Sequence, residues 1–129
     1  MMNRRILLAA FPALASAHVR PGARGPNGGP MADLGPYHAE LVARDGELVL
    51  HLYDMSDRPI RLPQATATAV VLAEGQQQTL TFAARPDGTS FVATGAFRAS
   101  PGLRVVVQLA PAPGQPRAQA RFTPADPQR

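Results

Sequence analysis

The feature that most constrains this fold is the pair Asp45-Gly46, which lies between two stretches in which apolar and polar residues alternate. An Asp-Gly pair between alternating arms is the strongest short-range signal for a two-residue β-hairpin turn. The arms are residues 37–43 and 47–54. The sequence therefore predicts an antiparallel hairpin whose register follows from its turn.

This register brings polar side chains together on one face of the hairpin. With the residues that flank the turn paired, Glu40 lies opposite His51 and His38 lies opposite Tyr53. Because side chains alternate across a strand, the two faces differ in character. The face expected to pack in the core carries Ala39, Leu41, Ala43, Leu48, Leu50 and Leu52. The other face carries His38, Glu40, Val42, Val49, His51 and Tyr53, and includes two of the three histidines.

Short β-type runs separated by turn signals continue to the end of the chain. Glu74-Gly75 is typical of a hairpin turn, and residues 85–88 (RPDG) and 100–102 (SPG) are typical of other tight turns. No window shows a helical period with caps. About seven strands favour a single all-β domain, an antiparallel β-sandwich of immunoglobulin-like type, with a small barrel as the alternative. The predicted strands are residues 37–43, 47–54, 65–73, 76–83, 90–96, 103–110 and 117–123.

The first residues have the pattern of a secretory signal peptide. Two arginines precede an apolar run from Ile6 to Ala15, and Ala15-Ser16-Ala17 supplies a small-x-small cleavage pattern. We therefore expect residues 1–17 to be removed and the protein to be periplasmic or secreted. An uncleaved membrane anchor is the alternative, although a run this short falls below the roughly 20 residues of a membrane span.

The remaining chain divides into three parts by composition. Residues 18–35 are rich in glycine and proline and lack periodicity, so we expect a lead-in loop rather than a strand or helix. Residues 36–123 form the expected β-sandwich. The polar residues 124–129 are expected to fray.

Composition excludes several classes of function. Loss of the signal peptide lowers the formal charge from +4 to +2, and the arginines are scattered among few aromatic residues, which does not suggest a nucleic-acid surface. The chain has no cysteine, so disulfides, thiolate metal sites and cysteine nucleophiles are excluded. No G-x-S-x-G motif is present, and residues 25–29 (GPNGG) lack the lysine of a phosphate loop. We expect a protein that is not an enzyme.

Metal binding is the chemistry that the polar hairpin face suggests. Opposed residues on antiparallel strands have Cβ atoms about 4.5 to 5.5 Å apart, so His38, Glu40 and His51 are candidates to converge on one ion. Imidazole and carboxylate ligands suit zinc, copper(II) or nickel. The rival interpretation is an ordinary solvated sheet face, on which a His–Glu pair contributes about 0.2 to 1 kcal/mol.

His18 is a fourth candidate ligand because cleavage after Ala17 would give it a free amine beside its imidazole. Copper(II) favours such nitrogen donors. In this one residue the chain resembles copper-binding β-sandwich proteins with an amino-terminal histidine, including periplasmic copper carriers and lytic polysaccharide monooxygenases. Met31 and Met55 are possible thioether donors for copper(I), but isolated methionines more often fill gaps, and they are left out of the predicted set.

A further resemblance spans about a third of the chain. Residues 25–29 (GPNGG), 35–42 (GPYHAELV), 48–54 (LVLHLYD) and 58–60 (RPI) resemble a pattern of small periplasmic proteins found near heavy-metal efflux systems. The pattern is similar to the amino-terminal β-domain of the periplasmic adaptor subunits of these pumps. Those adaptors continue into a helical hairpin and a lipoyl-like domain, so the resemblance implies metal handling or contact with an efflux-pump component rather than adaptor function.

These observations lead to two principal expectations. The first is a periplasmic, non-enzymatic β-domain that binds a divalent transition metal, copper or zinc, or assists a metal-efflux assembly through His38, Glu40, His51 and His18. The second is a secreted interaction module whose sheet edges or arginine-bearing faces bind a protein, with solvated histidines. A copper oxidase with an amino-terminal histidine is a third possibility that requires His18 at the mature terminus.

Overall fold

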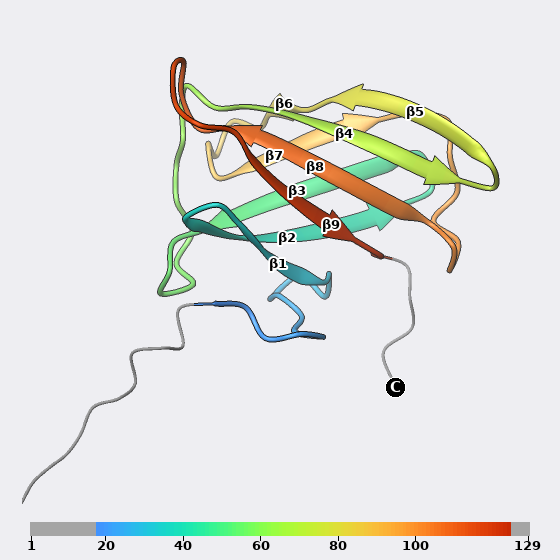
Figure 1. The fold of residues 1–129 in the computed structure, drawn as a ribbon, viewed down its shortest axis with the longest axis horizontal. Helices are drawn as coiled ribbons and strands as arrows, with labels where there is room; N and C mark the ends of the chain where they lie inside the picture. The colour runs from blue at the N-terminus through green and yellow to red at the C-terminus, as the bar shows by residue number, and fades with distance from the viewer. Residues whose placement is uncertain (1–17, 125–129) are drawn as a thin grey trace, which may run out of the picture.

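Two antiparallel β-sheets pack face to face in the computed structural model, which describes residues 18–124 (Figure 1). The five-stranded sheet has the order β1-β2-β3-β7-β6, and the four-stranded sheet has the order β5-β4-β8-β9. The β-sandwich architecture expected from the sequence is therefore confirmed. The strands are β1 (Met31–Leu34), β2 (Tyr37–Arg44), β3 (Glu47–Tyr53), β4 (Thr66–Ala73), β5 (Gln76–Thr81), β6 (Ala83–Ala84), β7 (Ser90–Thr94), β8 (Arg104–Ala110) and β9 (Ala118–Phe122).

The β2–β3 hairpin has the predicted register. Arg44 pairs with Glu47 across the turn. The pairs Glu40–His51 and His38–Tyr53 follow along the same ladder, as expected from the turn. Gly46 has a φ of 76°, a left-handed conformation that a glycine adopts without steric cost. The local turn chemistry thus determines which side chains share a face.

The hydrophobic core lies between the two sheets. Alternate residues of β2 and β3, among them Leu41 and Leu50, point inward and are fully buried. The facing sheet contributes alternate residues of β8, of which Val105, Val107 and Leu109 are buried. Four phenylalanines complete the core, Phe82, Phe91, Phe97 and Phe122. Burial of apolar area on this scale is the dominant stabilising term of a domain without disulfides.

Two strands were not predicted from the sequence. β1 lies inside the segment expected to be a loop, where it pairs with β2. Only four residues long and bounded by Pro30 and Gly35, it is too short for a periodic pattern to stand out. β6 has two residues and pairs with β7. The other seven strands each fall on one of the predicted runs.

Three residues of the polar hairpin face are buried, in contrast to the rival interpretation of the sequence. His38, Glu40 and Tyr53 are 3%, 0% and 5% exposed. Residues 18–30 of the lead-in segment lie beside β1 and β2 in Figure 1 and cover part of this face. The segment is held by backbone hydrogen bonds, including Gly25 N–H to Gly29 O at 2.8 Å and Met31 N–H to Ala23 O at 2.9 Å. The polar face is therefore covered in part, while Val42 and His51 on the same face are half-buried.

Some sequence-based predictions fall outside the described residues. These are the signal peptide of residues 1–17, with its cleavage site after Ala17, and all but the first residue of the fraying tail. Within residues 18–124, no helix is long and apolar enough to cross a membrane.

Candidate functional site

Glu40 is a buried carboxylate that is surrounded by hydrogen-bond donors. Its Oε2 accepts from the backbone N–H groups of Asn27, at 2.9 Å, and Gly29, at 2.8 Å. Its Oε1 accepts from the Asn27 side-chain amide at 2.9 Å and from the Tyr53 hydroxyl at 2.8 Å. Each oxygen thus receives two hydrogen bonds, which fills the acceptor capacity of a carboxylate. Glu40 therefore serves to hold the lead-in segment and has little capacity left to ligate a metal.

The glycines of residues 25–29 permit this close approach. A Cβ atom on Gly25 would meet the Glu40 side chain, and one on Gly29 would meet the backbone carbonyl of Leu41. The GPNGG segment is thus a cradle in which backbone N–H groups face a strand carboxylate. In the sequence this segment lacks phosphate-loop features and forms part of the resemblance to efflux-associated proteins, but nothing in its pattern connects it to Glu40.

Tyr53 shares this buried network. Burial raises the pKa of its hydroxyl, and the hydrogen bond to Glu40 raises it further because deprotonation would place two negative charges together. The Tyr53 hydroxyl is therefore kept as a donor to the carboxylate. Glu40, Asn27 and Tyr53 form a hydrogen-bonded unit that links β2, β3 and the lead-in segment.

His51 lies opposite Glu40 in the ladder but lines a different hollow from that of His38, beside Arg85 and Asn27. Burial lowers the pKa of the His51 imidazole. The charge of Glu40 opposes this shift, and the guanidinium of Arg85 adds to it. The structure does not bring the His51 imidazole to the same place as that of His38.

His38 is held between two carboxylates. Its Nδ1 lies 2.7 Å from Oδ1 of Asp57, and its Nε2 lies 3.6 Å from Oδ1 of Asp33. Asp33 stands directly opposite His38 in the β1–β2 ladder. Asp57 has a φ of 61°, a left-handed conformation that aspartate tolerates better than most residues, in the turn after β3. These contacts fix the orientation of the imidazole ring.

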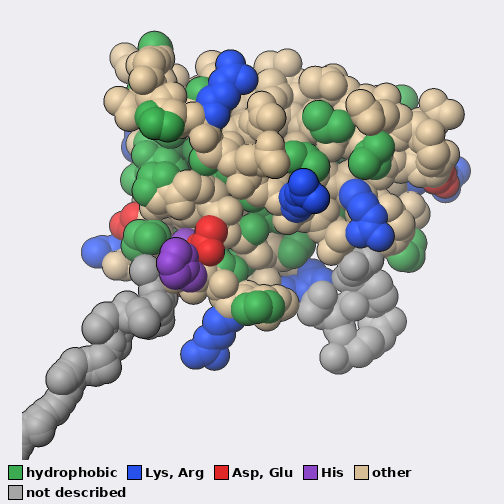
Figure 2. Space-filling model, in the orientation of Figure 1, with side chains coloured by type: hydrophobic (Ala, Val, Ile, Leu, Met, Phe, Trp, Pro, Cys, Tyr) green, Lys and Arg blue, Asp and Glu red, His purple; other side chains and the backbone are tan. Residues whose placement is uncertain are grey.

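His18 approaches the same carboxylate from the lead-in segment. Its Nδ1 lies 3.4 Å from Oδ2 of Asp33, and the adjoining backbone N–H of Val19 donates to Oδ1 of Asp33 at 3.0 Å. The His18 side chain is 80% exposed. Figure 2 shows histidine and acidic side chains side by side at the surface, close to where the described chain begins.

A hollow of about 320 Å³ opens beside these groups, and we call it the histidine hollow. Its lining includes His18, Met31, His38 and Asp57. Donor atoms on a tetrahedral ion with bonds of about 2.0 to 2.1 Å lie roughly 3.4 Å apart. The separations of Asp33 from both imidazoles are close to this value. Among residues 18–124, no three His, Asp or Glu side chains already stand in a group that could hold a metal ion. Rotation of the exposed His18 side chain is the adjustment that ligation would need.

The four residues predicted as ligands thus separate. His18 and His38 meet at one carboxylate, Glu40 is engaged by the lead-in cradle, and His51 stands apart. Sequence reasoning missed Asp33 and Asp57. The position of Asp33 opposite His38 depends on β1, a strand that the sequence did not predict. Asp57 comes four residues after Tyr53, the strand partner of His38, in a turn whose path the sequence pattern does not specify.

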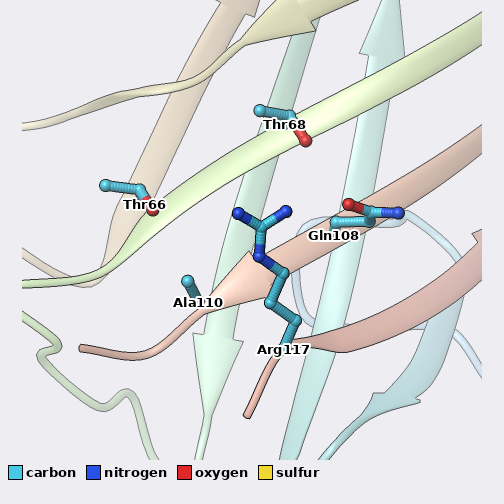
Figure 3. A pocket seen from close by; sticks show the side chains of 5 residues that line it. All are labelled: Thr66, Thr68, Gln108, Ala110 and Arg117. Carbon is cyan, nitrogen blue, oxygen red and sulfur yellow. The ribbon is translucent and has the colours of Figure 1, made fainter. Parts of the chain in front are cut away.

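Another hollow lies on the outer side of the four-stranded sheet. Figure 3 shows the Arg117 side chain extending toward Thr66, Thr68 and Gln108. This hollow has a volume of about 60 Å³, which has room for a few water molecules, and no acidic side chain lines it. The hollow is a shallow feature of a polar sheet face.

Comparisons with protein-family models, with curated proteins and with solved structures find no match for this chain.

Proposed function

We propose that this protein is a periplasmic, non-enzymatic β-domain that binds a divalent transition-metal ion through His18, Asp33 and His38. The observation that supports the proposal best is the approach of two imidazoles to a single carboxylate. Two imidazoles and one carboxylate suit zinc or copper(II). A metal ion bound by these three side chains would replace the contacts that Asp33 now makes with His18 and His38.

Asp57 supports this proposal because its carboxylate contacts the His38 ring nitrogen that faces away from Asp33. Metal-ligating histidines commonly donate their other ring N–H to a carboxylate, which orients the ring and raises its basicity. The 2.7 Å contact between His38 Nδ1 and Asp57 Oδ1 has this arrangement and leaves Nε2 directed toward Asp33. Loss of such a partner typically weakens metal affinity by about 10- to 100-fold.

The proposal extends to the fold type and to the cellular role. The strand order β2-β3-β7-β6 facing β5-β4-β8-β9 supports an immunoglobulin-like sandwich, with β2, β3, β7 and β6 in the places of strands A, B, E and D. The signal-peptide pattern and the resemblance to proteins of heavy-metal efflux support export and contact with an efflux-pump component. In that role the domain would hold an ion for transfer rather than transform a substrate.

Calorimetric titration of the exported protein with copper(II), zinc and nickel tests this function. We expect saturable binding of at least one ion with a Kd below about 100 μM, equivalent to about 5.5 kcal/mol. His38→Ala and, separately, His18→Ala should weaken binding at least tenfold. His18 is so exposed that its substitution should not disturb folding.

His51→Ala is the matched control because it removes an imidazole from the same hairpin without touching the histidine hollow. The His51→Ala protein should bind the metal ion with the same affinity as the unchanged protein. No saturable binding of any of the three ions, or equal losses in the His38 and His51 variants, would rule out the proposed site. Capture of a partner protein that is insensitive to chelator would instead favour the interaction-module alternative.

A further inference from the structure

A soft donor stands beside the proposed metal ligands. Met31 lies on β1 two residues before Asp33 and lines the histidine hollow together with His18 and His38. We propose that Met31 makes this a copper site that holds copper(I) as well as copper(II). The inference rests on the proposed function, since it assigns an ion and a further ligand to the same site.

The register of β1 and β2 places Met31 near His38. Met31 pairs with Glu40 and Asp33 pairs with His38, so Met31 and His38 are diagonal neighbours on adjacent antiparallel strands. Because residues two apart on a strand share a face, Met31 and Asp33 point to the same side of the sheet. Diagonal neighbours have Cα atoms about 7 to 8 Å apart, within reach of long side chains. The flexible thioether of Met31 can therefore approach the imidazole of His38.

Met31 is not enclosed as a gap filler would be. It is only partly buried, and it borders the histidine hollow and two neighbouring hollows. Leu34, on the same strand, is fully buried in the core, in contrast to the partly exposed Met31. The position of Met31 thus presents a polarizable sulfur to an open space that two imidazoles also reach.

The donor set distinguishes copper from zinc. Thioether sulfur is a soft ligand that favours copper(I), whereas imidazole and carboxylate accommodate copper(II). A zinc site would gain little from the sulfur. The charges around the hollow are also balanced, because Arg20 and Arg24 line it as well as Asp57, with Asp33 beside it. A monovalent ion meets half the Coulomb repulsion from these arginines that a divalent ion meets.

Competition titrations with the exported protein test the inference. Copper(I) affinity is measured under reducing conditions against bicinchoninate, and copper(II) affinity is measured by competition with glycine. Met31→Leu removes the sulfur and nearly conserves the side-chain volume. We expect this variant to bind copper(I) at least tenfold more weakly and copper(II) less than threefold more weakly.

Met55→Leu is the control, because Met55 is 43% exposed and does not line the histidine hollow. It should change neither affinity. Unchanged copper(I) binding in Met31→Leu, or equal losses of both ions, would overturn the role of Met31. If His38→Ala still lost copper(II) in that case, the proposed metal site would stand and only this inference would fail. An absence of any copper binding would overturn this inference, and the proposed metal site would fall with it only if zinc and nickel also failed to bind.

Discussion

The backbone N–H of Gly29 donates to the fully buried carboxylate of Glu40 across 2.8 Å. This bond joins the lead-in segment to the central hairpin, and the two bonds from Asn27 reinforce it. The same segment carries His18 and continues into β1, which carries Asp33. The Glu40 network therefore supports the arrangement of the proposed ligands, while the oxygens of Glu40 itself are occupied by four hydrogen bonds.

Glu40→Ala should destabilise the fold strongly. The substitution leaves four donors without their acceptor, and two of them, the Gly29 N–H and the Tyr53 hydroxyl, make buried bonds. Each unsatisfied buried donor costs about 1 to 3 kcal/mol. We expect a loss of at least about 3 kcal/mol in the free energy of unfolding, measured with urea. Glu40→Gln should lose less because it keeps one acceptor oxygen.

Glu47→Gln provides the comparison for both Glu40 variants. Glu47 lies on the same hairpin, beside the turn, and is only half-buried. Its substitution should change the unfolding free energy by about 0.5 kcal/mol or less, as is usual for surface positions. A Glu40→Ala protein as stable as Glu47→Gln would show that the carboxylate network does not support the fold.

Gly25→Ala should also destabilise the protein, through steric conflict rather than lost hydrogen bonds. The added Cβ would overlap the Glu40 carboxyl group, which is itself fixed by four donors. Overpacking of this kind costs about 1 to 3 kcal/mol. Gly102→Ala is the matched control because its Cβ would meet nothing within 4 Å. Equal melting temperatures for the two variants would contradict the close packing of the cradle.

Tyr53 should make stability fall at high pH. Its pKa is raised in the folded protein, so above pH 10 the unfolded chain loses the phenolic proton first. Since the folded state then binds more protons, the unfolding free energy decreases as pH rises through this range. In Tyr53→Phe this part of the decrease should disappear. Urea unfolding at pH 9, 10 and 11 measures the effect, and identical slopes in the two proteins would refute it.

His51 should have the opposite pH dependence near neutrality. Its pKa is lowered in the folded protein, so the unfolded chain takes up a proton first as pH falls through about 6.5. The contribution of His51 therefore destabilises the folded state progressively below pH 6.5 and vanishes above it. His51→Gln should flatten the stability curve between pH 7 and 5. A curve that keeps its slope in this variant would show that burial of His51 does not matter.

The hairpin could be predicted from sequence because its determinants are local. The Asp45-Gly46 turn and the alternation of its arms specify which residues oppose one another, and the observed ladder has the same pairs. Apolar residues also recur at every second position of β8, and Val105, Val107 and Leu109 are the buried ones. Period and turn chemistry act over a few residues, so one sequence is sufficient to read them.

The environment of Glu40 and His38 could not be predicted in this way. The carboxylate is enclosed by residues 25–29, more than ten positions earlier in the chain, and nothing in the local pattern shows that this segment folds back. Asp33 joins His38 only because four residues form the short strand β1. Contacts of this kind depend on how a loop packs, and the sequence of a loop without periodicity has no pattern that predicts them.

The most direct test of the proposed site is a residue-resolved NMR experiment. Paramagnetic copper(II), added in substoichiometric amounts to the ¹⁵N-labelled exported protein, broadens the amide signals nearest the bound ion. The proposal predicts that the amide signals of Val19, Asp33 and His38 disappear first, while those of His51 and Arg85 persist. Broadening centred on His51, or spread evenly over the sandwich, would contradict a metal site at the histidine hollow.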